Sequence, residues 1–364
     1  MKAIVLAGGF ATRLRPISYV IPKLLFPVAG KPMIYWTLDL LKRFQVGEVI
    51  LCVNYLADAL RKVVGDEYRG MRIRYSLEES PLGTAGPIKL ASKITRLPPT
   101  FVAMNGDVVT NIELDEMFEK HKASGAVVTD ALCEVQDSSR FGAVEVDSAL
   151  RIIRFVEKPN VKDPGRLINA GIYLIERSLL KMIPSGRKVS LEREIFPDLA
   201  KRGKLAGFCT SGYWFDIGTI SDYRRVNFDL MRTIIGKVVV RQGRSLIADD
   251  SKLAPPCIIG RNSEMGRGSM LGPNVVSGKN VQLGRNVQVA NSILFDDVKI
   301  GDGSRVIGAI VGSNSLIGKR VRIVTGAIVS PGVHVHDNVR IGRGAVIHPY
   351  REVAEHVRPW AQLM

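Results

Sequence analysis

The sequence predicts an α/β domain followed by a parallel β-helix. Up to about residue 230, strand-like and helix-like segments alternate, which is typical of an open, mostly parallel (mixed) sheet with helices on both faces. After about residue 255 the pattern repeats every six residues, which is typical of short strands wound into a solenoid. A chain of 364 residues has room for two domains, and we expect them at 1–235 and 236–364.

The first domain is predicted to be Rossmann-like. We expect strands at 2–7, 48–53, 71–76, 100–105, 126–134, 143–146, 151–156 and 168–175. Helical patterns fall between them, at 31–45, 56–66, 84–95, 113–123, 177–182, 190–202 and 219–234. Ligands of such sheets bind beyond the carboxyl ends of the strands. Gly8 and Asp107 each follow a predicted strand, so we expect them at one rim.

The second domain is predicted from two hexad registers. In the first, glycines recur every six residues from Gly260 to Gly284. In the second, branched apolar residues recur every six residues from Val311 to Ile347, each preceded two positions earlier by a small or branched residue. Positions i and i−2 of a strand face the same side, so both point inward. The pattern resembles the left-handed hexapeptide-repeat solenoid. The registers are out of phase across 289–311, which predicts a distortion or an extra loop there.

The ends of a solenoid leave unpaired strand edges. The tail Tyr350–Met364 is a candidate cap for one end. Association with further copies is the other solution, and we expect a homo-oligomer, with a capped monomer as the alternative.

The composition of the chain limits the classes of molecule that we expect it to bind. The net charge is +16, divided as +7 over residues 1–230 and +9 over 231–364. Such a spread favours attraction of small anionic substrates over nucleic-acid binding, although a merely solvated basic surface is an equal alternative. No apolar run is long enough to span a membrane, and the start is too short for a signal peptide. Scattered cysteines without a CxxC pair indicate a cytoplasmic protein.

The most informative stretch is the first predicted strand and the turn after it. Leu6 and Ala7 lead into Gly8-Gly9, and glycine lets backbone N–H groups approach a ligand closely. The cationic residues Arg13, Arg15 and Lys23 follow, which suits the phosphates of a nucleotide. The stretch is neither a P-loop nor a dinucleotide fingerprint. A strand followed by glycines is also common in α/β proteins without such a role.

The string from Leu6 to Pro16, with Pro22-Lys23, resembles the signature L-A-G-G-x-G-T-R-L-x-P…P-K of the sugar-1-phosphate nucleotidylyltransferases. One position departs, since Ala11 stands where the family has its third glycine. The resemblance covers nearly the whole chain. It is nearest to the mannose-1-phosphate guanylyltransferases with a hexapeptide-repeat tail, judged by Pro81–Pro87, Arg154–Pro159 and the hexads.

Two acidic residues are candidate metal ligands. Asp107 ends an apolar strand and Asp216 follows three aromatic residues. Mg²⁺ typically takes one or two carboxylates together with substrate phosphates. Asp216 can equally be read as the N-terminal residue of a helix. The resemblance implies that both residues hold the metal, because Asn105-Gly106-Asp107 and the Gly212–Gly218 stretch match the family.

Further site residues follow from the same resemblance. In the motif Phe155–Pro159, Glu157 is implied to receive sugar hydroxyls and Lys158 the sugar phosphate, although such a pair is more often a plain surface pair. Asn169 and Gly142 match positions near the sugar. The loop with Gly83 and Thr84 resembles the one that recognises the base.

Glu78 lies just before that loop. An ionised carboxylate can accept hydrogen bonds from the two adjacent donors of guanine, and it disfavours adenine. The alternative is that the Glu78 side chain simply faces water.

The resemblance implies transfer of a nucleotidyl group, with GTP and mannose 1-phosphate favoured. The sugar phosphate is already a nucleophile at neutral pH, so no general base is needed, and the first half has only His121, expected on a surface helix. Arg13 is assigned to the pyrophosphate, Lys23 to the α-phosphate region and Lys158 to the nucleophile. Alternatives are UTP- or dTTP-dependent transfer to glucose 1-phosphate, a weakly active regulatory homologue, and an added acyltransferase, for which His334, His336 and His348 lack an excursion loop.

Overall fold

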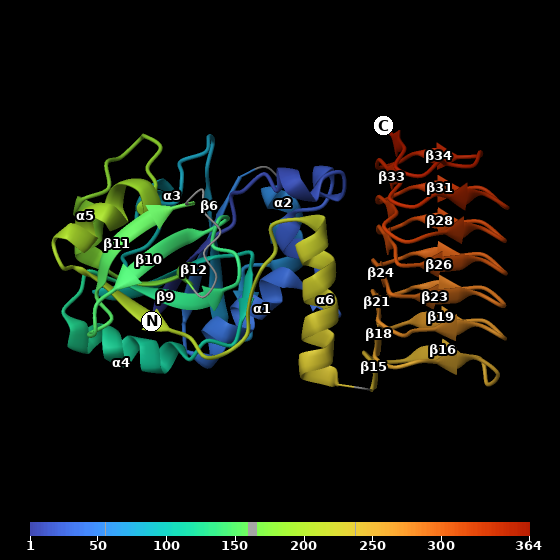
Figure 1. The fold of residues 1–364 in the computed structure, drawn as a ribbon, viewed down its shortest axis with the longest axis horizontal. Helices are drawn as coiled ribbons and strands as arrows, with labels where there is room; N and C mark the ends of the chain where they lie inside the picture. Colours follow the sequence, from blue (N-terminus) through green and yellow to red (C-terminus); the bar gives the residue numbers. More distant parts are fainter. Residues whose placement is uncertain (55, 159–165, 237) are drawn as a thin grey trace. The chain divides into compact units, whose positions relative to one another are not determined.

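The computed structural model describes residues 1–54, 56–158, 166–236 and 238–364 (Figure 1). The chain divides into two compact units. The first contains Met1–Phe10 and Met33–Asp216, and the second contains Ala11–Pro32 and Ile217–Met364. The predicted domain boundary at 235/236 remains a prediction. The second compact unit starts earlier, at Ile217, and also contains residues 11–32.

The first unit is built on a mixed ten-stranded sheet, and all eight predicted strands are present. Four adjacent strands are parallel: β7 (Thr100–Asn105), β1 (Lys2–Leu6), β4 (Glu48–Val53) and β6 (Met71–Leu77). Antiparallel strands extend the sheet on both sides, namely β12 (Arg166–Glu176), β10 (Gly142–Val146), β11 (Ile152–Glu157), β9 (Val128–Val135) and β5 (Glu67–Tyr68), while β13 (Leu205–Cys209) pairs parallel with β9. The predicted fold class is therefore confirmed.

The first unit also contains five α-helices in its described part. They are α1 (Met33–Arg43), α2 (Ala57–Val64), α3 (Ala85–Ala91), α4 (Leu114–Ser124) and α5 (Phe196–Lys201). Helix α3 contacts β1, β4 and β6, while α4 contacts β9, β12 and β13. The predicted helices at 177–182 and 190–202 contain a 3-10 helix, η4 (Arg177–Lys181), and a π-helical turn, η5 (Leu191–Ile195), that runs into α5. None of the helices in the described part has the length and apolar character that a membrane crossing requires.

One sequence expectation is wrong. His121 does not lie on the solvent face of α4, because its ring is buried, with Nδ1 2.7 Å from Thr129 Oγ1 and Nε2 3.3 Å from Glu176 Oε1. Burial lowers the pKa of His121, and Glu176 opposes that shift only in part. The residues next to His121 in the sequence are hydrophilic, so the local pattern did not predict that its side chain points inward.

The second unit contains a three-sheet parallel solenoid, consistent with the left-handed β-helix expected from the hexads (Figure 1). The first sheet contains β15 (Val239–Arg241), β18 (Cys257–Ile259), β21 (Val275–Ser277), β24 (Ser292–Leu294), β27 (Ile310–Val311), β30 (Ile328–Val329), β33 (Val346–Ile347) and β35 (Gln362–Leu363). The second contains β16 (Ser245–Ile247), β19 (Ser263–Met265), β22 (Gln282–Leu283), β25 (Lys299–Ile300), β28 (Leu316–Ile317), β31 (His334–Val335) and β34 (Glu352–Val353). The third contains β17 (Lys252–Leu253), β20 (Met270–Leu271), β23 (Gln288–Ala290), β26 (Arg305–Ile307), β29 (Arg322–Ile323) and β32 (Arg340–Ile341).

The phase change between the two hexad registers has a simple structural cause. Paired residues in neighbouring coils are 18 positions apart early in the solenoid, as Leu271 and Val289 are. They are 17 apart in the middle, as Val289 and Val306 are, and 18 apart again from Val311 to Val329. One residue is therefore missing from each of two coils, so the predicted distortion is confirmed and the extra loop is absent.

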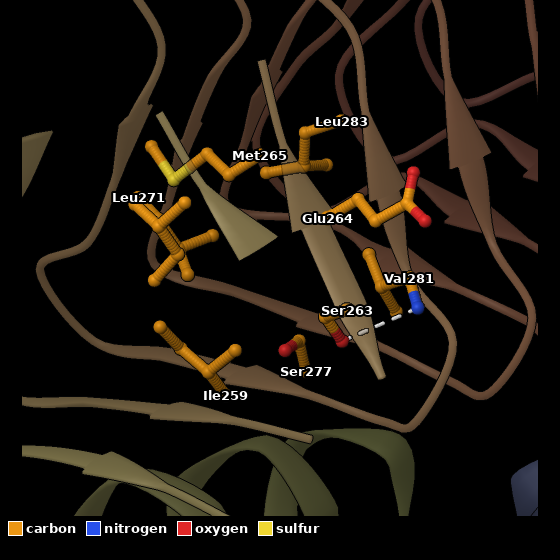
Figure 2. Close-up of a pocket in the computed structure, with 9 residues that line it drawn as sticks. Ile259, Ser263, Glu264, Met265, Leu271, Ser277, Val281 and Leu283 are labelled. Carbon is orange, nitrogen blue, oxygen red and sulfur yellow. Dashed lines mark hydrogen bonds between the residues drawn. The ribbon is translucent and has the colours of Figure 1, made fainter. Parts of the chain in front are cut away.

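The solenoid interior is filled by its inward residues. Figure 2 shows Ile259, Met265, Leu271 and Leu283 lining the early coils, with Ser263 Oγ accepting a hydrogen bond from Val281 N. The space left between them is about 10 Å³. A cavity of that size holds one water molecule at most, so it accommodates no substrate.

The tail Tyr350–Met364 does not fold back as a separate cap. It continues the solenoid as a last coil, with β34 pairing with β31 and β35 pairing with β33. Tyr350, Trp360 and Met364 remain largely exposed on it.

The segment 11–32 and helix α6 (Ile220–Ile235) pack on the solenoid within the second unit. The rings of Phe26, Tyr223 and Phe295 form a buried cluster, with centroids 5.4 Å apart for Phe26–Tyr223 and 5.7 Å apart for Phe26–Phe295. Tyr223 Oη donates a 2.7 Å hydrogen bond to Pro27 O, and Asn227 Oδ1 accepts one of 2.9 Å from Ala29 N. The cationic segment is thus anchored to the solenoid by aromatic packing and buried hydrogen bonds.

Candidate functional site

The rim of the first unit is formed where β1 and β7 end. Ala7 N donates to Cys52 O at 2.8 Å, which continues the strand alignment past Leu6. Gly106 N donates to Leu6 O at 2.9 Å, so Asp107 follows directly beside the start of the glycine turn. Gly8 and Asp107 therefore lie at one rim, as predicted.

Asp107 and Asp216 are brought together by two short strands that the sequence did not predict. Strand β8 (Val108–Thr110) pairs antiparallel with β14 (Trp214–Asp216), and Asp216 stands opposite Val108, the residue after Asp107. Trp214 Nε1 fixes β14 by donating to Ala170 O at 2.9 Å. Both carboxylates are half-buried, and Arg140 Nη2 lies 3.8 Å from Asp216 Oδ2. One carboxylate precedes β8 and the other ends β14, and carboxylate oxygens beside a glycine turn are a suitable donor set for Mg²⁺.

The reading of Asp216 as the first residue of a helix is wrong. Helix α6 begins at Ile220 and is capped by Thr219, whose Oγ1 accepts from Asp222 N at 3.1 Å. Asp222 Oδ2 in turn accepts from Thr219 N at 3.0 Å, which completes a capping box. Asp216 therefore has no capping role.

Glu78 lies against the glycine turn. A Cβ on Gly8 would be 2.5 Å from Glu78 Oε1, so a side chain there would displace this carboxylate, and Asn54 Nδ2 donates to Gly8 O. Glu78 Oε2 accepts from Leu82 N at 3.2 Å. The side chain is 6% exposed, and burial raises the pKa of Glu78 although the Leu82 N–H opposes the shift. The alternative that Glu78 faces water is wrong.

The loop with Gly83 and Thr84 is held by the segment around Val189. Gly83 has φ +82° and packs directly on Val189 O, which leaves no room for a side chain. Thr84 Oγ1 donates to Glu192 Oε2 at 2.6 Å and accepts from Leu191 N at 2.8 Å. The Thr84 hydroxyl therefore ties the loop to the segment of Leu191 and Glu192.

Glu157 and Lys158 end strand β11. Gly142 is the register partner of Glu157, and a Cβ there would be 2.6 Å from the Phe155 ring. Lys158 Nζ lies 3.6 Å from Glu157 Oε1 and is more than half exposed. Burial, followed by the charge of Glu192, raises the pKa of Glu157, while Lys158 lowers it. Pro159 of the motif lies outside the described residues.

Asn169 stabilises strand β12 where the register of this strand with β9 shifts. Its Nδ2 donates to Tyr173 Oη at 2.9 Å, and its Oδ1 accepts from Gly171 N at 2.7 Å. The register with β9 shifts between Asn169 and Tyr173. Both polar ends of Asn169 are thus used to shape the strand beside the predicted sugar position.

Arg13 and Lys23 belong to the second unit. Arg13 lies on η1 (Thr12–Leu14) and Lys23 on η3 (Lys23–Leu25). Ala11 has φ +46°, a left-handed conformation that favours glycine, which explains why the signature has glycine at that position. The Arg15 guanidinium lies 4.9 Å from the Tyr19 ring, which is 5.9 Å from the His348 ring of the solenoid.

Glu192 is a further candidate site residue, which the sequence did not predict. It accepts hydrogen bonds from Thr84 Oγ1 and Ser190 Oγ, both at 2.6 Å, and its charge acts on Glu157. Nothing in the local pattern distinguishes Glu192 from Glu194, which forms a surface pair with Arg187 at 2.9 Å.

A Rossmann-like sheet with a glycine turn and two adjacent carboxylates at its rim defines the class of α/β proteins that bind phosphate-bearing nucleotides. Comparison of families makes the assignment specific. The family model described as Nucleotidyl transferase matches residues 2–233, and the model described as GMPPB C-terminal domain matches residues 253–361. The chain therefore belongs to the nucleotidyl transferase family.

Curated relatives cover most of the chain. The mannose-1-phosphate guanyltransferase of Aspergillus fumigatus is 38% identical over 336 residues, which is 89% of each chain. The mannose-1-phosphate guanylyltransferase of Mycobacterium tuberculosis is 36% identical over 277 residues, covering 73% of this chain and 76% of that protein.

Solved structures are similar over a part of the chain. HddC from Yersinia pseudotuberculosis complexed with GMP-PN has a TM-score of 0.53 and 28% identity, covering 63% of this chain and 99% of that one. A putative glucose-1-phosphate thymidylyltransferase from Bacillus anthracis has a TM-score of 0.57 and 27% identity, covering 64% and 96%.

Proposed function

We propose that the protein transfers a guanylyl group from GTP to mannose 1-phosphate, giving GDP-mannose and pyrophosphate. The observation that carries the proposal is the adjacency of Asp107 and Asp216 beside the glycine turn. The guanylyltransferase relatives, one of which is similar over 89% of the chain, support the choice of substrates. The absence of a membrane-crossing helix among the described residues is compatible with action in the cytoplasm.

The reaction requires positioning and charge neutralisation, because the sugar phosphate is already an anionic nucleophile. A phosphate oxygen attacks the α-phosphorus of GTP, a new P–O bond forms, and the bond to the leaving pyrophosphate breaks. We assign Arg13 to the pyrophosphate, Lys23 to the α-phosphate and Lys158 to the sugar phosphate. Asp107 and Asp216 would hold Mg²⁺, which supplies positive charge to the phosphate oxygens.

We assign the substrates to positions along the rim of the first unit. Backbone from Leu6 to Gly9 would contact the triphosphate, because Gly8 and Gly9 present no side chains there. The base would lie by Glu78 and the backbone of Gly83 and Thr84. The sugar would lie by Gly142 and Glu157, with Asn169 acting through the strand that it braces.

The test is pyrophosphate release by the purified chain with Mg²⁺, across a grid of nucleoside triphosphates and sugar phosphates. We expect GTP with mannose 1-phosphate to give the highest kcat/KM. A preference for UTP or dTTP with glucose 1-phosphate would select the uridylyl or thymidylyl alternative. No turnover with any pair would select the regulatory homologue. A separate assay with acetyl-CoA tests the added acyltransferase activity, which consumption of acetyl-CoA would support.

A change at Glu78 tests base recognition. In Glu78→Gln, one of the two carboxylate acceptors for guanine N1–H and N2–H is replaced by a donor, so we expect KM for GTP to rise about tenfold or more. The raised pKa means that wild-type recognition is lost, as pH falls, at a higher pH than for an exposed glutamate. The measurement is KM for GTP against pH. Glu79→Gln, at an exposed neighbour, is the control and should leave KM unchanged.

The aromatic anchor of the cationic segment gives a second test. Phe26 follows Lys23 by three residues and packs on Phe295 of the solenoid. In Phe295→Ala the support of Lys23 loosens, and we expect kcat/KM to fall about tenfold, since misplacement of a catalytic group by about 1 Å can cost up to 10²-fold. Steady-state kinetics would show this, with circular dichroism to verify folding. Leu316→Ala, on an outward position of the solenoid, should change nothing.

We also propose that the protein is a homo-oligomer, supported by the exposed strand edge of the last coil. Light scattering at several concentrations measures the mass, and a value of one chain would contradict the proposal.

A further inference from the structure

We propose that His334, His336 and Glu352 form a binding site for a divalent transition metal such as Zn²⁺ on the outer face of the solenoid. None of the three residues is among those assigned above to nucleotidyl transfer or to Mg²⁺. One candidate ligand atom from each of the three side chains lies within 4.8 Å of the others. Metal ligands at about 2.0–2.1 Å from Zn²⁺ lie roughly 3.3 Å from one another, so small side-chain rotations complete the site.

The backbone enforces this grouping. His334 and His336 flank the buried Val335, so both rings point out from the same face of the strand, and they stack with centroids 4.7 Å apart. Glu352 is the register partner of His334 in the next coil, and Val353 is that of Val335. Adjacent strands lie about 4.8 Å apart, which is a distance that one metal ion can bridge.

The position of His336 is chemically unusual within the repeat. The strand pairing between coils aligns each residue with its counterpart in the next coil. By this alignment, the residue that corresponds to His336 is a glycine in four earlier coils: Gly266, Gly284, Gly301 and Gly318. His336 is flanked by Gly318 on one side and by Ala354 on the other. Small neighbours leave the imidazole open for a metal and its remaining water ligands.

The side chains of His336 and Glu352 are already in contact. His336 Nε2 and Glu352 Oε1 are 2.5 Å apart, so two candidate ligand atoms lie next to each other where one metal ion would bind. A ligating imidazole binds through an unprotonated ring nitrogen. Two imidazoles and a carboxylate suit Zn²⁺, Co²⁺ or Ni²⁺ and not Mg²⁺, which prefers oxygen ligands.

We expect the bound metal to link two neighbouring coils of the solenoid. Strand β34 is the last strand of its sheet, so its outer edge has no further partner among the described strands. A metal that joins His336 on the coil below to Glu352 ties the last coil to the body of the solenoid. We expect saturating Zn²⁺ to raise the unfolding temperature by about 5 °C.

The experiment uses the full chain, first stripped of metal with a chelator. Zn²⁺ is titrated by calorimetry and Co²⁺ by visible absorption. We expect one equivalent to bind, and His334→Gln with His336→Gln to weaken that equivalent at least 100-fold. His356→Gln, at an exposed histidine of the same coil, and Asp107→Asn should retain it. Circular dichroism verifies that the variants are folded.

Three results would overturn the proposal. They are no bound equivalent in the wild type, an equivalent that survives the double histidine change, and an equivalent lost to the same extent in His356→Gln. The first would leave His336 and Glu352 as a hydrogen-bonded pair on the surface. Because none of these readouts uses GTP turnover, they are distinguishable from failure of the proposed enzymatic function.

Discussion

Asp107→Asn is expected to lower kcat for nucleotidyl transfer by about 10²–10³-fold, equivalent to about 3–4 kcal/mol. Asparagine keeps the shape of the side chain but removes the negative charge that would hold Mg²⁺ next to the phosphates. The β8–β14 pairing depends on backbone groups and on Trp214, so the fold should survive. We also expect the Mg²⁺ concentration for half-maximal rate to rise.

The measurement is pyrophosphate release over a Mg²⁺ titration. Asp216→Asn should behave alike, and the double variant should lose less than the product of the two single effects, because both residues serve one ion. Asp115→Asn, an exposed carboxylate of α4, is the matched control and should stay within about twofold of wild type. If Asp107→Asn kept the wild-type rate and Mg²⁺ dependence, the two carboxylates would not be the metal site.

Lys23→Ala should also cost about 10²–10³-fold in rate. The ammonium group would neutralise charge that develops at the α-phosphate during attack, so its loss affects the transition state more than the bound GTP. We therefore expect kcat to fall much more than KM rises. Lys23→Arg should recover only a part, because the planar guanidinium does not replace a compact ammonium.

Steady-state kinetics of pyrophosphate release separate these parameters. Lys319→Ala removes an exposed lysine from the same unit and should leave both unchanged. A Lys23→Ala enzyme with near wild-type kcat would show that Lys23 has no part in the chemical step, while leaving the assignment of Asp107 and Asp216 intact.

Much of the fold was predictable because the signals are local. The strand at 48–53 and the strand at 100–105 have the predicted ends, since each is a buried apolar run between polar turns. The short strands β8 and β14 were missed because three residues carry too little periodicity. Yet these two strands bring Asp107 and Asp216 together, so the part of the site with the largest expected effect was the part with the weakest local signal.

Other differences come from packing that a local pattern does not contain. His121 was expected on the surface because its neighbours in α4 are charged. Its ring instead contacts Thr129 on β9 and Glu176 on β12. Glu192 was missed because its partners Thr84 and Glu157 are distant in sequence. The missing residue in each of two coils was visible only as a phase change, since pairing between coils decides where the chain shortens.

By itself the sequence determined the two architectures, because the spacing of apolar residues dictates helix, strand and solenoid. It also determined the chemistry available at the rim, through glycines and carboxylates at strand ends. Only the tertiary structure decided which distant groups meet: the pairing of β8 with β14, the burial of Glu78 against Gly8, and the stacking of Glu352 on the coil of His334. The physical reason is that these contacts depend on strand pairing and close packing between segments far apart in the chain.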